Sequence, residues 1–135
     1  MKHLVWACCL ALVLAAVPAW GETDVTGLWV SDFYGNKVEC HLEQRGRVLY
    51  GVVYVNTSAG ERNTYHVAGV VTGDHVRAQH GGGNYFDGQV SGDTASGTLY
   101  MKKSGISLAM QAKRIKHGKT VPGGLEWPAG LPLGN

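Results

Sequence analysis

Apolar and polar residues alternate along most of the chain, in short runs separated by turns that usually contain glycine. Successive side chains of a strand point to opposite faces, so this alternation predicts strands with one buried face. No proline occurs between residues 22 and 121, as expected where every backbone N–H is needed for a ladder. The pattern predicts eight strands, at Val25–Ser31, Lys37–Gln44, Arg47–Asn56, Asn63–Val71, His75–His80, Tyr85–Ser91, Ala95–Met101 and Ile106–Arg114.

The segments between these predicted strands are all of hairpin length. Such connections make neighbours in sequence antiparallel neighbours in the sheet. Closing the sheet on itself removes both exposed edges, whereas a two-sheet sandwich would need longer crossovers. We therefore predict an all-β domain over residues 22–115, an eight-stranded antiparallel up-and-down β-barrel.

The N-terminal end has a different character. Residues 1–21 have a basic residue, Lys2, near their start, then an apolar run from Leu4 to Val17, and small residues at their end. This is the layout of a cleavable export signal. The run is shorter than the ~20 residues of a membrane-spanning helix. We expect a periplasmic or secreted protein without stable membrane insertion.

The C-terminal end, residues 116–135, is rich in glycine and proline and cannot build a core of its own. A mobile tail is the commoner outcome for such a segment. Packing of Leu125, Trp127 and Leu131 against the barrel is the alternative.

Charge and cysteine content exclude several classes of protein. Without Lys2, which lies in the signal, eleven of the twelve basic residues remain, compared with ten acidic residues. The chain after the signal therefore has a net charge of about +1. That balance is not the footprint of a nucleic-acid-binding protein. Cys40 is the only cysteine after the signal, so an intramolecular disulfide is excluded. Cys40 and His41 are adjacent on a strand and point apart, so they cannot form a catalytic pair.

Candidate catalytic and metal-binding residues are few. The loop His80-Gly81-Gly82-Gly83 is similar to the oxyanion loop of esterases, but the chain has no Gly-x-Ser-x-Gly elbow to accompany it. The histidines lack paired ligand spacing, so we expect no metal and no cofactor. His80 with Asp87, near one mouth of the barrel, is the only cluster worth mutating, and no reaction follows from it. We expect the protein not to be an enzyme.

The alternation assigns a nearly uncharged face to the barrel interior. Gly69, Gly88 and Gly97 on that face would leave room for a cavity. The alternative is that Tyr65, Phe86 and Met110 fill the room, because an eight-stranded barrel can either be solid or hold one small ligand.

Several motifs resemble a known family. They are Gly27-Leu28-Trp29, the stretch Leu42-x-Gln44-x-Gly46-x-Val48-x-x-Gly51 and the closing Ala112-Lys113-Arg114. Together they resemble the lipocalin-like, or calycin, β-barrels of exported bacterial proteins. The resemblance implies that Trp29 lies near a closed barrel end with Arg114 packed over it, and often that a pocket lies at the other end. Biotin binding, as in the related avidins, is not expected because no tryptophan lies between Trp29 and Trp127 to line a pocket.

These observations favour an exported, non-enzymatic binding protein that holds a small hydrophobic or amphipathic ligand in its barrel. The expected ligand-binding residues are Tyr65, Phe86, Leu99 and Met110 inside, with Tyr85 and Tyr100 at the mouth.

The alternative is a protein-interaction or inhibitor module with a solid core that acts through its loops or its third strand. Val48–Val55 in that strand is apolar on both faces, so its outer face needs a cover. The cover could be a second subunit, which would give a homodimer, the Trp127 tail, or simply a tyrosine-lined patch.

Overall fold

The computed structural model describes residues 23–131 of the 135-residue chain. The predicted signal at residues 1–21 lies outside the described residues. Within them the chain forms strands and no helix. The strands are β1 (Gly27–Phe33), β2 (Asn36–Arg45), β3 (Val48–Asn56), β4 (Arg62–Thr72), β5 (His75–His80), β6 (Tyr85–Ser91), β7 (Thr94–Tyr100) and β8 (Ser107–His117).

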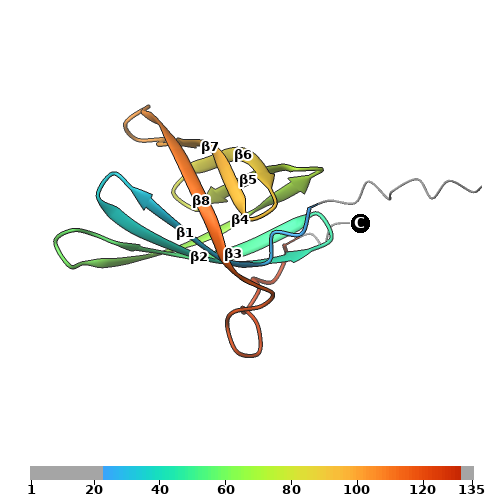
Figure 1. Cartoon of the computed structure of the whole chain (residues 1–135). Coiled ribbons are helices and arrows are strands. Elements are labelled where there is room, and N and C mark those ends of the chain that lie inside the picture. The colour runs from blue at the N-terminus through green and yellow to red at the C-terminus, as the bar shows by residue number, and fades with distance from the viewer. Residues whose placement is uncertain (1–22, 132–135) are drawn as a thin grey trace, which may run out of the picture.

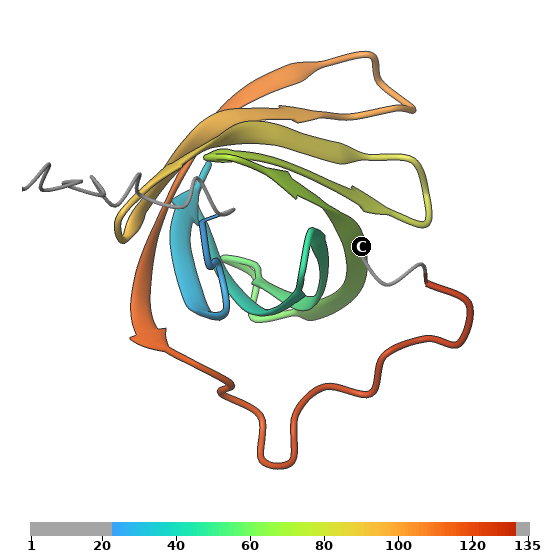
Figure 2. The same ribbon diagram turned by 90° about the vertical axis from the view of Figure 1, so that its right-hand side faces the viewer.

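Each strand pairs antiparallel with its neighbours in sequence, and β1 pairs with β8 to close the barrel. Figure 2 shows the strands wrapping around a common axis. The predicted eight-stranded up-and-down barrel is therefore confirmed. Strand β8 continues to His117, two residues beyond the predicted end of the domain at residue 115.

One end of the barrel, called the closed end here, carries the β2–β3, β4–β5 and β6–β7 turns. Each turn contains a glycine in the left-handed region: φ is 59° at Gly46, 60° at Gly73 and 59° at Gly92. Two-residue hairpins favour this geometry because its twist matches that of the strands, and glycine adopts it without strain.

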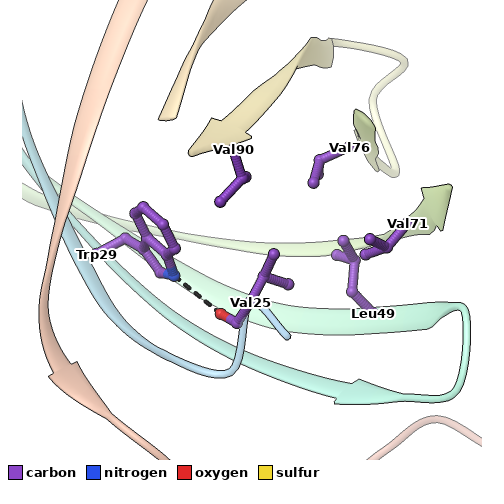
Figure 3. Close-up of a cluster of buried hydrophobic side chains, with 6 residues drawn as sticks. All are labelled: Val25, Trp29, Leu49, Val71, Val76 and Val90. Carbon is purple, nitrogen blue, oxygen red and sulfur yellow. Dashed lines mark hydrogen bonds between the residues drawn. The ribbon is translucent and has the colours of Figure 1, made fainter. Parts of the chain in front are cut away.

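A cluster of buried apolar side chains fills the closed end (Figure 3). Its members come from the segment before β1 and from β1, β3, β4, β5 and β6: Val25, Trp29, Leu49, Val71, Val76 and Val90. The indole Nε1 of Trp29 donates a hydrogen bond of 2.9 Å to the Val25 carbonyl oxygen, so burial leaves no unpaired donor on this ring.

Arg114 seals the closed end over this cluster. Its guanidinium carbon lies 5.0 Å from the centroid of the Trp29 ring, the contact that the family resemblance implies. The same side chain is 8% exposed and donates to the Asp24 and Thr26 carbonyl oxygens and to Asp93 Oδ1. The hydrogen bond from Arg114, helped by one from His117, lowers the pKa of the Asp93 carboxyl. Arg114 thereby ties the chain before β1 to the β6–β7 turn.

The chain after β8 packs on the outside of the barrel. Residues 119–131, called the strap here, run beneath β2 and β3 in Figure 1 and around the outside of the wall in Figure 2. The expected mobile tail is thus wrong for this part of the chain, which contacts the barrel through the Trp127 side chain and the Leu125 backbone. The strap supplies the cover that the two-sided apolar strand β3 needs.

Glu43 anchors the strap to β2. Its carboxylate is 3% exposed and accepts hydrogen bonds from the Leu125 backbone N–H and from Trp127 Nε1, the latter at 3.1 Å. The Trp127 ring also lies 5.7 Å from the Tyr50 ring and 4.2 Å from the Arg45 guanidinium carbon. A buried carboxylate is stable only when its oxygens are hydrogen-bonded, so anchor and strap depend on each other.

The interior glycines do not leave the room that their small size suggests, because neighbouring atoms already occupy it. A Cβ at Gly69 would collide with the Arg77 carbonyl oxygen, and one at Gly97 with the Asp87 carbonyl oxygen. At Gly88 the position is taken by the Ser96 carbonyl oxygen and the Phe86 ring. These glycines permit close approach of neighbouring backbones.

Candidate functional site

The open end of the barrel, opposite the closed end, has an apolar lining that solvent reaches. The inward side chains there are only half-buried and lie outside the buried cluster: Tyr65, Val67, Phe86, Leu99, Leu108 and Met110. The sheet itself covers the outer side of an inward residue, so its accessible surface faces the lumen. The inward side chains are therefore packed together at the closed end and partly solvent-accessible at the open end.

Strand register brings four of the predicted ligand-binding residues into this lumen. Phe86 on β6 lies opposite Leu99 on β7, while Met110 on β8 lies opposite the inward Gly97. Tyr65 on β4 lies opposite the inward Val53. Strict alternation explains this success, because each of these positions shares a face with residues of the buried cluster.

Tyr85 and Tyr100, predicted as mouth residues, lie near the open end but on the outer face. They are directly opposite each other, one residue out of phase with the inward Phe86 and Leu99. Their rings stack with centroids 4.6 Å apart and planes at 20°. They belong to an outer surface and do not line the lumen.

His80 is a polar residue on the inner face near the mouth, but it is not close to Asp87 as the sequence suggested. The His80 ring packs edge-on against Tyr65 at 4.9 Å, and His80 is paired with the inward Val67. Asp87 faces outward and lies 2.6 Å from His75 Nε2. The proposed His80–Asp87 cluster is therefore wrong, since the two side chains are on opposite faces. Alternation with the inward Phe86 already indicates that Asp87 faces outward, whereas the inward position of His80 follows from its pairing with Val67.

Cys40 lies inside the barrel, opposite Trp29 on β1 and Val53 on β3. Burial raises the pKa of its thiol to about 12. A thiol with that pKa is protonated at neutral pH and unreactive, so Cys40 acts as a small apolar core residue.

A further cavity, of about 850 Å³, lies along the seam between β1 and β8. The β1–β8 ladder ends at Val30 and Lys113, and beyond it the Ser31 hydroxyl donates to the Gln111 carbonyl oxygen. In Figure 1 the β1–β2 and β7–β8 hairpins diverge from this point. Charges of both signs line the cavity, including Asp32, Lys37, Glu39 and Lys113. Sequence reasoning missed it because the seam exists only once the first and last strands meet.

Two other kinds of feature are absent from residues 23–131. No group of three or more His, Cys, Asp or Glu side chains there is arranged to hold a metal ion. This part of the chain also contains no helix that is long and apolar enough to cross a bilayer.

Comparisons with models of known protein families, with curated proteins and with solved structures found no match. The closed eight-stranded barrel is consistent with a lipocalin-like fold.

Proposed function

We propose that this chain is an exported, non-enzymatic, lipocalin-like binding protein that holds one small hydrophobic or amphipathic ligand in the open half of its barrel. The observation that carries the proposal is the difference between the two ends. Inward side chains are fully buried at the closed end but retain accessible apolar surface at the open end. Apolar surface that water contacts inside a concave site favours binding of an apolar molecule.

The lining also indicates how such a ligand would be oriented. Phe86, Leu99 and Met110 offer apolar contacts along one wall, and the Leu49–Val71–Val76 layer forms the floor. His80 and the Tyr65 hydroxyl supply the polar groups near the mouth. We expect the apolar part of the ligand to point toward the floor and a polar head toward His80 and solvent.

The outer face of β3 gives no support to the alternative of an interaction module that acts through this strand. Val48, Tyr50 and Val52 on that face are buried in the single chain, and Tyr50 lies against Trp127 of the strap. A homodimer through β3 stays a prediction, but the structure does not have the exposed apolar face on β3 that suggested this dimer.

The proposal is tested by comparing ligand binding by two variants. One has a larger side chain in the lumen, and the other has the same side chain at the neighbouring, outward-facing position. Met110→Trp places a large ring in the lumen, whereas Ala109→Trp places the same ring on the exposed outer face of the same strand. Fluorescence titration with anilinonaphthalenesulfonate and with oleate would measure affinity. We expect roughly tenfold weaker binding, or more, for Met110→Trp, and parent-like binding for Ala109→Trp.

Native mass spectrometry of protein isolated from its own compartment would show whether a ligand copurifies. Thermal unfolding of both variants checks that they fold. Equal affinity in the parent and in folded Met110→Trp, or no binding of either probe by the parent, would overturn the proposal.

A further inference from the structure

Three side chains form a layered stack on the outer face of β5, β6 and β7. The Arg77 guanidinium carbon lies 4.5 Å from the centroid of the Tyr85 ring, and the Tyr85 ring in turn stacks on Tyr100 at 4.6 Å. Both faces of Tyr85 are therefore occupied. Cation–π and ring stacking of this kind fix the orientation of flexible side chains before any ligand arrives.

The face of Tyr100 that points away from Tyr85 is not covered by a large side chain from the next strand. The residue directly opposite Tyr100 on β8 is Ser107, whose side chain is small. Tyr100 is 36% exposed and the neighbouring Ile106 is 52% exposed. The regular spacing of strands, ~4.8 Å, leaves a position over Ser107 where one more flat group would continue the stack.

A cavity of about 380 Å³ opens beside this position. Its lining combines the two tyrosines with polar and cationic groups that include Arg77, Gln79, Lys102 and Ser107, and no acidic residue lines it. The Lys102 stem packs over Gly83, which has φ of 94°, so the lysine lies against the β5–β6 loop. Asp87 is opposite Arg77 across the strands, but its Oδ1 is engaged by His75 Nε2.

We propose that this outer surface, called the tyrosine shelf here and defined by Arg77, Tyr85, Tyr100, Lys102 and Ser107, is a second binding site that takes an acidic sugar residue of a saccharide. The site is distinct from the lumen, because its residues face outward on the same strands whose alternate residues face in.

The chemistry of the tyrosine shelf decides the ligand class. A sugar ring has one apolar C–H face, which stacks on an aromatic ring, and an edge of hydroxyls, which Gln79, Ser107 and the tyrosine hydroxyls can bind. The two cations, with no acidic residue in the lining, select a ring that carries a carboxylate. A shallow, solvent-exposed groove with one free aromatic face suits such a polar ring better than a purely hydrophobic molecule, which requires enclosure.

Saccharide binding to the full chain would be tested by NMR, using an oligogalacturonate and the uncharged oligogalactose of the same length. We expect the acid to shift amide signals of the open-end parts of β6, β7 and β8, with a dissociation constant of ~1 mM or lower. The neutral saccharide should bind at least ~tenfold more weakly, and added salt should weaken binding of the acid.

Variants distinguish specific binding at the tyrosine shelf from non-specific binding elsewhere on the surface. Tyr100→Ala and Arg77→Gln should each weaken binding of the acid about tenfold, while Tyr34→Ala, which removes a tyrosine that is 67% exposed in the β1–β2 turn, should leave it unchanged. Equal binding of the acidic and neutral saccharides, or binding that survives Tyr100→Ala, would overturn the proposal, as would the absence of localised shifts.

The result is independent of the proposed lumen function. Tyr100→Ala should bind anilinonaphthalenesulfonate as the parent does, and Met110→Trp should bind the oligogalacturonate as the parent does. Loss of only one kind of binding therefore identifies which of the two proposals fails.

Discussion

The contact between Glu43 and the strap can be isolated with a double-mutant cycle. Glu43 accepts two N–H donors from residues 125 and 127 while 3% exposed. Hydrogen bonds to a charged group contribute ~1.5–3 kcal/mol each when a buried partner is lost. The strap can detach from the barrel, however, so the cost of Glu43→Ala cannot exceed the free energy with which the strap docks. We expect a cost of ~2–3 kcal/mol in the free energy of unfolding.

The cycle compares the parent, Glu43→Ala, a chain that ends at Gly118, and the shortened chain with Glu43→Ala. Without the strap Glu43 is a surface residue, so its substitution there should change stability by less than ~0.5 kcal/mol. Urea denaturation followed by circular dichroism gives the four free energies. The expected coupling between Glu43 and the strap is therefore ~2 kcal/mol.

The matched control for this cycle is Glu39→Ala. Glu39 lies on the same outward face of β2 as Glu43, and it contacts Arg62 in an exposed ion pair at 3.8 Å rather than the strap. Its coupling to the strap should be near zero, because exposed ion pairs contribute little. A coupling for Glu43 no larger than that for Glu39 would refute the conclusion that this carboxylate anchors the strap.

Two further predictions concern groups whose pKa is shifted. Hydrogen bonds from Arg114 and His117 lower the pKa of Asp93 in the folded protein. Its ionised form therefore stabilises the fold at a pH above the unfolded pKa of ~3.9, and this contribution is lost as the pH falls through the folded pKa. The difference in Tm between the parent and Asp93→Asn should shrink below ~pH 4, and a difference independent of pH would contradict this. The Cys40 thiol, with a pKa of about 12, should react with an aromatic disulfide reagent only after unfolding in urea, and rapid modification of the folded chain would show that the interior near Trp29 is accessible.

The sequence pattern predicted the barrel and its two faces because the period of a strand is fixed by backbone geometry. Phe86 and Met110 could be placed inside from alternation alone, and the family resemblance implied that Trp29 lies at the closed end. Export and ligand binding stay predictions, because contacts within the chain do not report on either.

Other features depended on contacts between distant parts of the chain. The strap binds β2 through Glu43, and nothing in a segment rich in glycine and proline indicates a carboxylate that lies more than eighty residues earlier. The seam cavity depends on where the first and last strands stop pairing. Glycines on an inner face suggest space, whereas at Gly69 and Gly97 a neighbouring backbone already occupies the position of a side chain.

The pairing of β6 with β7 links the two proposed sites. Phe86 and Leu99 face the lumen, while Tyr85 and Tyr100, one residue away on each strand, form the tyrosine shelf. A slip of one residue would exchange the two faces, so both sites depend on the same register. The inward pair of Gly88 and Gly97 fixes that register, because the backbones there approach too closely for any side chain. Glycine at these two positions therefore holds β6 and β7 in the register that places Phe86 and Leu99 on the inner face and Tyr85 and Tyr100 on the outer face.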